Sequence, residues 1–501
     1  MKQIRIFATL LFVVMLSSVA TAQFVSPVDF MRNNPRAAFA NPAFYTADYG
    51  YFDFALGGIN IGAQNIGLKY DKFFRFNGNG QPTTVDLNAG VASLRDVNYL
   101  NTYVNVDIFN CGRRTKYGYF TYTHRFREVE SLRYNKDMVQ LLANGNSAFL
   151  GESNPADINI GLSARAFQEF DFGYQMSLLE ELNIGVRLKF LMGFMDAKTQ
   201  ALNVKLYTDP ETYALKLMSA ANVNASLPVE IVNDENGNIR LKDNHFNPAT
   251  LFKNYGLGID LGAEYKFDDH WGAAAALNDL GFIRWKTYAI NFSGELQDNG
   301  SFYDDGAFVF PGLTAEQVND IVNTPGYVNG LVDSLRGYFQ LQNQNLVGYT
   351  TGLYTNLMLR GYYDLTPEHR FSAQFTGFNV GLGMKPAMTL AYTGSFNERY
   401  DVVATYTMMP GGFDNLGLGL SANLGGMLIY FATNNLFGFF NPANRSMVNA
   451  QFGISFTSGD KISRSETIVL RDHAAEAEAE YEAGSETGDE IESKAGTESE
   501  E

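Results

Sequence analysis

A run of strict alternation between apolar and polar residues extends from Asn254 to Phe267. Its odd-numbered residues are apolar and its even-numbered residues are glycine or polar. Because successive side chains of a strand point to opposite faces, the run predicts a strand with one apolar and one polar face. Tyr255 and Tyr265 lie ten residues apart, which in a strand tilted by about 40° corresponds to roughly 25 Å. This span equals the apolar band of an outer-membrane barrel.

The same pattern recurs at Leu182–Met195 and Asn415–Leu424, where glycine and polar residues again share one face. A soluble β-sandwich also alternates, so periodicity alone leaves open whether the polar face looks outward into solvent or inward. The decision between the two requires evidence about the compartment.

The first residues of the chain supply that evidence. Lys2 and Arg5 precede an apolar stretch at Ile6–Val19, and small residues lead up to Gln23. This arrangement predicts a signal peptide over residues 1–22, cleaved after Ala22. A transmembrane anchor is the alternative, but the apolar stretch is short for about 20 spanning residues and is followed by a cleavage site. We therefore expect export to the Gram-negative outer membrane.

The composition favours one large all-β body. The 501 residues contain 48 glycines, 40 phenylalanines, 28 tyrosines and a single cysteine, Cys111, so no intrachain disulfide stabilises the fold. We predict a transmembrane antiparallel β-barrel of about 14 strands with short helical loop inserts at Asn135–Asn144 and Thr314–Gln340. More candidate strands are found than 14, because some are expected to be hairpins inside loops.

Two further segments flank the barrel. Residues 23–46 contain three prolines and predict an irregular lead-in or plug that enters the lumen. The barrel is expected over residues 47–458. Residues 459–501 are predicted to form a disordered acidic tail, because twelve acids and one base lie between Asp472 and Glu501 with hardly an apolar residue.

The net charge of −17 therefore describes the tail more than the barrel. A solvated tail is one interpretation, and a tether for a basic partner or divalent cations is the other. Nucleic-acid binding is excluded, since the chain has no basic stripe.

Charged residues on the polar faces are the candidate site. If the apolar faces contact lipid, where a charge near the midplane costs about 2 to 4 kcal/mol, the polar faces line the lumen. They could form a polar path for solutes, or they could pair across a filled interior and close it. The lumen-lining candidates are Asp107, Arg125, Arg127, Arg165, Arg187, Lys189, Asp260, Glu264, Lys266 and Arg360.

Catalysis and metal binding have no support in the sequence. Of the five histidines, His473 falls in the tail, His245, His270 and His369 fall at expected turns, and His124 falls on an outward face. No nucleophile motif accompanies them, and no pair of histidines or cysteines has the spacing of metal ligands. We predict neither an enzyme nor a bound cofactor.

Three stretches carry a family resemblance: Asn41–Phe44, Asn278–Trp285, and the closing run from Tyr430 to Phe456. They resemble a family of uncharacterised exported outer-membrane β-barrels, which is similar to long-chain fatty-acid transporter barrels and to barrels of the type IX secretion apparatus. The resemblance implies transport or binding of small molecules, hydrophobic ones among them, within the lumen. Outer-membrane lipid and a small hydrophobic ligand are the implied partners. The alternative is a scaffold barrel in surface export or envelope assembly that binds envelope proteins through its acidic tail.

Overall fold

The structure is a computed structural model. It describes residues 25–44, 50–76, 82–115, 117–151, 153–211, 215–233, 239–241, 252–296, 308–310, 342–345, 348–379, 384–397, 399–441 and 445–458. The expected signal peptide, the acidic tail and the helical insert Thr314–Gln340 lie outside these residues. Within the described ranges, no helix combines the length and apolar character needed to cross a membrane.

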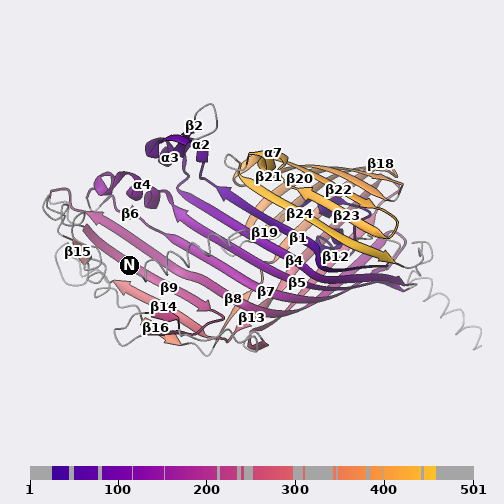
Figure 1. Cartoon of the computed structure of the whole chain (residues 1–501), viewed down its shortest axis with the longest axis horizontal. Coiled ribbons are helices and arrows are strands. Elements are labelled where there is room, and N and C mark those ends of the chain that lie inside the picture. The colour runs from indigo at the N-terminus through magenta and orange to yellow at the C-terminus, as the bar shows by residue number, and fades with distance from the viewer. Residues whose placement is uncertain are drawn as a thin grey trace, which may run out of the picture.

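A closed antiparallel β-barrel of 14 strands forms the body of the protein, as predicted (Figure 1). Each strand pairs with the next along the ring, and the last pairs with the first. In ring order the strands are β1 (Gly50–Ile66), β4 (Val97–Thr115), β5 (Gly118–Asn135), β7 (Ile160–Ser177), β8 (Leu182–Thr208), β12 (Tyr255–Lys266), β13 (Trp271–Trp285), β18 (Asn356–Thr366), β19 (His369–Asn379), β20 (Met384–Phe396), β21 (Tyr400–Met409), β22 (Gly412–Asn423), β23 (Met427–Thr433) and β24 (Met447–Ser458).

Shorter elements decorate the barrel. The remaining strands are β2 (Phe74–Phe76), β3 (Pro82–Val85), β6 (Ala156–Asp157), β9 (Leu215–Ser226), β10 (Ile231–Asn233), β11 (Ile239–Leu241), β14 (Ala289–Leu296), β15 (Phe308–Phe310), β16 (Gln342–Asn345) and β17 (Tyr349–Gly352). The helices are η1 (Pro27–Phe30), η2 (Pro35–Phe39), α2 (Tyr70–Phe73), α3 (Leu87–Ser93), α4 (Lys136–Asn144), η3 (Asn146–Ala148) and α7 (Leu436–Phe440). The predicted insert Asn135–Asn144 is thus the helix α4.

The two ends of the barrel differ in their connections. One end, which we call the short-turn end, carries turns of two to four residues, such as those between β7 and β8 or β18 and β19. β1 begins and β24 ends at this same end. The opposite rim carries long connections, among them residues 67–96 and 286–355. This asymmetry is typical of outer-membrane barrels, whose short turns face the periplasm.

Side chains segregate across the wall as the alternation requires. On β12, Leu257 and Leu261 are about half exposed on the outer face, whereas Asp260 and Glu264 are buried inside. Aromatic side chains lie on the outer face near the short-turn end, where Trp271 packs against Tyr363 with 4.8 Å and Phe371 against Tyr392 with 5.4 Å between ring centroids. Aromatic residues in this position are expected at a membrane interface.

Two long strands explain why the sequence predicts more than 14 candidate strands. The sequence predicts separate strands at Ile158–Arg165 and Phe170–Met176, but from Ile160 onward both lie in the single strand β7. It likewise predicts separate strands at Leu182–Met195 and Gln200–Tyr207, which both lie in β8. In the β7–β8 ladder Ala166 pairs with Met195 and Phe167 pairs with Gly193. The extra residue, Phe194, therefore lies on β8 and interrupts the alternation of outward and inward side chains there. The continuous strand β8 looked like two strands for this reason, whereas the alternation of β7 is uninterrupted.

Beyond the rim, β8 leaves the barrel. It pairs with β12 up to Met192 and with β9 from Asp196 onward. β9 then pairs with β14, and β14 with β16, so these strands form a sheet that projects past the short strands β18–β24 (Figure 1). We call it the projecting sheet.

The outward position of Leu261 gives a test of the membrane-facing surface. Replacement Leu261→Arg places a charge near the middle of β12 and should destabilise the barrel by about 2 to 4 kcal/mol. Leu424→Arg is the matched control, because Leu424 lies exposed in the turn between β22 and β23, where the cost should be about 0 to 1 kcal/mol. Denaturant titration of both variants refolded into lipid vesicles measures the difference. Equal costs would contradict the outward, lipid-facing placement of Leu261.

Candidate functional site within the barrel lumen

The N-terminal segment, Val25–Phe44, lies inside the barrel. It makes hydrogen bonds to strands that are far apart around the ring: Asn33 to Asp401 of β21, Arg36 to Asp107 of β4, and Gln175 of β7 to the carbonyl oxygen of Ala43. On a further strand, β18, Arg360 donates to the carbonyl oxygen of Asp29. Only a segment within the lumen can contact all of these strands at once.

Local sequence explains why this segment is compact and not a strand. Pro27 and Pro35 are the first residues of the short helices η1 and η2. A backbone N–H at this position would have no partner within the helix, so proline costs no hydrogen bond there. Ser26 and Asp29 form a reciprocal capping box at η1, and Asn34 caps η2. Asn41 continues the segment, donating from its amide to the carbonyl oxygens of Ala263 and Ala275.

Arg36 anchors the segment to the wall. Its guanidinium contacts Asp107 Oδ2 at 3.0 Å and Ser455 Oγ at 2.7 Å, and it also donates to the carbonyl oxygen of Gly57. The guanidinium also lies over the ring of Tyr430. These contacts join β1, β4, β23 and β24 through one side chain, which is itself buried.

Rings of the segment stack on arginines of the wall. Phe39 lies between Arg125, whose Cζ is 3.6 Å from the ring centroid, and Arg187 at 5.3 Å. Arg360 lies in turn between Phe30 at 4.1 Å and Phe44 at 4.6 Å. Cation–π contacts of this kind contribute roughly 0.5 to 2 kcal/mol each, the larger values applying where water is excluded.

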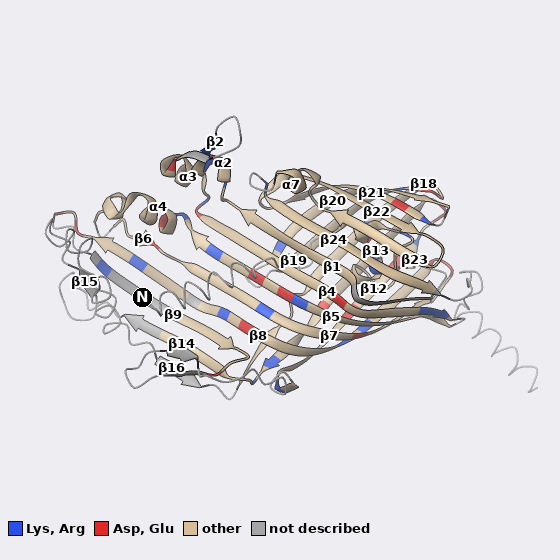
Figure 2. Ribbon diagram, in the orientation of Figure 1, with Lys and Arg blue, Asp and Glu red and all other residues tan. Residues whose placement is uncertain are grey.

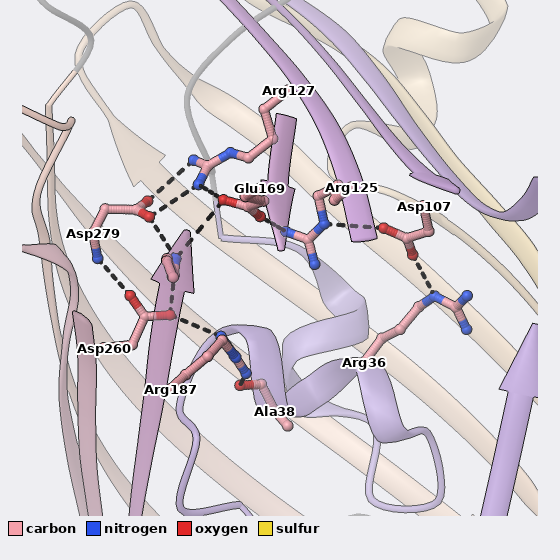
Figure 3. A network of polar contacts seen from close by, with 10 residues as sticks. Arg36, Ala38, Asp107, Arg125, Arg127, Glu169, Arg187, Asp260 and Asp279 are labelled. Atoms are coloured by element: carbon pink, nitrogen blue, oxygen red, sulfur yellow. Dashed lines mark hydrogen bonds and ion pairs between the residues drawn. The ribbon is translucent and has the colours of Figure 1, made fainter. Parts of the chain in front are cut away.

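A network of ion pairs fills the middle of the lumen (Figures 2 and 3). Asp107 pairs with Arg125, and Arg125 reaches Glu169 at 3.4 Å. Glu169 and Asp279 both bind Arg127, at 3.0 and 2.9 Å. The chain of contacts then runs through Lys189, Asp260 and Arg187. All of these side chains are buried.

Arg36 belongs to the N-terminal segment, whereas the other charges of this network belong to the wall. Ion pairs join four carboxylates, Asp107, Glu169, Asp260 and Asp279, to five cations, Arg36, Arg125, Arg127, Arg187 and Lys189. Asp171 lies beside this group, opposite Lys189 in the β7–β8 ladder. Since breaking a buried ion pair is costly, the contact between Arg36 and Asp107 stabilises the docked segment.

A bulge in β13 brings Asp279 into the network. The β12–β13 register shifts between the pairs Ile259–Leu280 and Leu261–Leu277, and Asp279 has a φ of 58°. This left-handed conformation is uncommon outside glycine and stores strain. Its N–H donates to Asp260 Oδ1 at 2.7 Å, while the neighbouring Asn278 amide donates to the carbonyl oxygen of Ala40. Asn278 and Asp279 therefore both point inward.

A loop enters the lumen from the opposite rim. Arg165, paired with Asp196 at 2.7 Å, donates to the carbonyl oxygen of Gly352. The ring of Tyr354 stacks on Arg165, and the Thr355 hydroxyl donates to the carbonyl oxygen of Asp279. The N-terminal segment and this loop, Gly352–Thr355, thus approach the same bulge from two sides.

The ten residues proposed from the sequence divide into groups. Asp107, Arg125, Arg127, Arg187, Lys189 and Asp260 meet in the network, and Arg165 lies beside the entering loop. Glu264 accepts hydrogen bonds from Asn183 and Tyr362, Arg360 contacts the N-terminal segment, and Lys266 is half-buried at the short-turn end.

Sequence analysis missed Arg36, Glu169, Asp196 and Asp279. Glu169 and Asp196 fell between predicted strands, Arg36 lies in a segment without periodicity, and Asp279 lies where a bulge breaks the alternation. An inward position of Glu169 could have been found by extending the alternation of Arg165 and Phe167.

The described histidines lie outside this network. His124 bonds Gln168 Oε1, His270 bonds the carbonyl oxygen of Asp364, and His369 bonds the Tyr392 hydroxyl. His245 and His473 fall outside the described residues. In the described part of the chain, no three histidine, cysteine or acidic side chains gather as metal ligands would.

The fold and the sidedness of its wall define an outer-membrane β-barrel whose lumen is occupied. More specifically, residues 42–434 match the model of a family of unknown function, DUF5723, and the chain belongs to that family. The resemblance to an uncharacterised barrel family is therefore confirmed. No curated protein matches the sequence.

Several solved barrels are similar in structure. The toluene transporter TbuX of Ralstonia pickettii has 10% identity and a TM-score of 0.38, with 86% of this chain and 97% of that chain covered. A FadL homologue of Pseudomonas aeruginosa has 10% identity and a TM-score of 0.36, with 88% and 99% covered. The toluene transporter TodX of Pseudomonas putida has 8% identity and a TM-score of 0.36, with 88% and 98% covered.

The ion network gives a stability prediction. Asp279→Asn removes one of the two carboxylates that bind Arg127 and one of those that bind Lys189, so the buried network loses a negative charge and the free energy of unfolding should fall by about 3 to 5 kcal/mol. The matched control is Asp414→Asn, because Asp414 pairs with Arg445 at 3.0 Å but both side chains are about one-third exposed; its cost should be about 0 to 1 kcal/mol. Denaturant titration in detergent measures both. A cost for Asp279→Asn as small as the control's would show that the network contributes no net stability.

Proposed function

We propose that this barrel passes or binds small, hydrophobic molecules within its lumen, and that the N-terminal segment closes the path. The protein would be exported with residues 1–22 removed. The observation that carries the proposal is a wide barrel whose interior is occupied by a segment held through noncovalent contacts alone.

The number of strands supports the proposal that the N-terminal segment closes the lumen. About eight strands make an interior that wall side chains can fill by themselves, and the interior widens roughly in proportion to strand number. A barrel of 14 strands therefore needs additional chain to close it. The N-terminal segment fills this space. It can leave the lumen without breaking the sheet, since its backbone takes no part in the sheet ladders.

The wall behind the segment supports a hydrophobic cargo. Val28, Phe30 and Met31 pack on Val403 and Ala432 of the wall. Ala37, Ala40 and Phe44 pack on a second apolar area of the wall, formed by Ala274, Ala276 and Met358. If the segment withdraws, two apolar areas of the lumen become accessible beside charged groups. An apolar molecule could bind there without contacting the ion network directly.

Removal of the segment tests the proposal. A barrel lacking residues 25–44 should conduct in planar bilayers and admit small apolar solutes into vesicles, whereas the full chain should be nearly closed. Silence of both proteins in both measurements would contradict passage through the lumen.

A point variant sharpens this test. Arg36→Ala removes the anchor to Asp107 and Ser455 and should raise the frequency of opening. Arg32→Ala is the matched control from the same segment, because Arg32 makes an exposed hydrogen bond to the carbonyl oxygen of Pro367. The control should behave like the unmodified protein.

A second candidate function is a scaffold in surface export or envelope assembly. The projecting sheet formed by β8, β9, β14 and β16 favours it, because traffic through the lumen does not require a sheet beyond the rim. In this case envelope proteins would bind the sheet or the acidic tail.

Site-directed crosslinking tests the scaffold. A photoreactive residue at the exposed Asn203 of β8 should give a defined protein adduct in cells, whereas the same residue at the lipid-facing Leu188 should not. A chain that ends at Ser458 then reports whether the tail contributes to the adduct. Equal adduct patterns at both positions would count against a docking role for the sheet.

A further inference from the structure

Arg360 differs from the other arginines of the lumen in its partners. Arg125, Arg127, Arg165 and Arg187 each contact a carboxylate at 3.0 Å or less. Arg360 is only 8% exposed, yet in the described ranges no carboxylate oxygen lies within 4.0 Å of its guanidinium. Its Nε donates to Gln374 Oε1 at 2.8 Å, and its Nη1 donates to the carbonyl oxygen of Asp29 at 3.0 Å. Both partners are neutral groups.

One nitrogen of this guanidinium remains unsatisfied. Nη2 of Arg360 is buried and has no hydrogen-bond partner among the described residues. The neighbouring carboxylates are engaged elsewhere: Asp364 binds Arg370 at 2.7 Å, and Glu264 binds Asn183 and Tyr362. The Asp29 carboxylate accepts the N–H of Ser26. Because buried charges are normally paired, Arg360 has the properties of an anion site.

The space beside Arg360 has the shape for a ring. Phe44 stacks on the guanidinium at 4.6 Å and rests on Ala274, Ala276 and Met358. The small side chains of Ala274 and Ala276 make room for the Phe44 ring, which contacts an apolar surface and the guanidinium of Arg360. The ring of Phe30 also lies against this guanidinium, with 4.1 Å between its centroid and Cζ.

We propose that Arg360, with Ala274, Ala276 and Met358, forms a binding site for a monoaromatic carboxylate, and that Phe44 occupies this site as a tethered competitor. The ring of the ligand replaces Phe44, and its carboxylate accepts a hydrogen bond from Nη2. Phe44 fills the apolar part of the pocket but cannot supply the anion, so a soluble aromatic acid makes one contact more than the segment does. The inference rests on the proposed function and names a substrate class for the same lumen.

Binding of phenylacetate to the full chain in detergent tests the proposal. Phe44→Ala should bind phenylacetate at least about tenfold more tightly than the unmodified protein, because the competing ring is gone. Arg360→Gln should lose the preference for phenylacetate over neutral ethylbenzene, since the cation that recognises the carboxylate is removed. Isothermal titration calorimetry measures the affinities, and the heat-modifiable mobility of a folded barrel verifies each variant.

The matched control is Arg32→Ala. Arg32 lies in the same segment, but its hydrogen bond to the carbonyl oxygen of Pro367 is exposed, so this variant should leave phenylacetate affinity unchanged. Should Phe44→Ala not fold, Phe44→Leu keeps the apolar contact and removes the stacked ring, and it should still bind more tightly. Equal binding of phenylacetate and ethylbenzene by the unmodified chain and by Arg360→Gln would overturn the site.

These measurements separate the site from the proposed function. Binding at equilibrium requires no passage through the membrane, so a chain that binds phenylacetate but neither conducts nor admits solutes would retain the site and refute transport. A truncated barrel that conducts while Phe44→Ala binds no phenylacetate would refute the site alone.

Discussion

A barrel of 14 strands encloses more space than the inward side chains of its wall can fill, and the rest of the structure depends on how that space is closed. Two pieces of chain enter it. The N-terminal segment occupies one part, and Gly352–Thr355 enters from the opposite rim. The N-terminal segment takes no part in the ladders of the barrel, and the loop leaves the β13–β17 ladder after Gly352, so their polar groups must find partners inside the lumen. Wall side chains supply them: Gln175 bonds the carbonyl of Ala43, and Arg165 bonds that of Gly352.

Charge ties this filling to the wall. Arg36 of the N-terminal segment shares the buried carboxylate of Asp107 with Arg125 of the wall. Departure of the segment therefore has an electrostatic cost as well as a packing cost. That cost falls if water or a cation enters with the opening, because the desolvation of Asp107 is then relieved. Opening of the lumen is therefore coupled to its hydration.

The sequence predicted the closed barrel because alternation and strand length are local properties. Leu257 and Asp260 could be assigned to opposite faces from their positions on β12 alone. Arg127 and Lys189 could be assigned to the lumen in the same way. Their common partner Asp279 could not, since its inward direction depends on a bulge with a positive φ that alternation does not encode. The stacks of Phe39 and Phe44 on arginines join residues far apart in sequence, and no periodic signal exists in a proline-rich segment.

Asn278 is the point where the two lumen segments meet. Its amide donates both to the carbonyl oxygen of Ala40 in the N-terminal segment and to Asn356 Oδ1, directly after the entering loop. The adjacent Asp279 holds that loop through its carbonyl oxygen and the ion network through its carboxylate. A shift of either segment thus strains the same two-residue bulge, whose backbone is already in an uncommon conformation. Both lumen segments and the ion network therefore depend on contacts with these two adjacent residues of the wall.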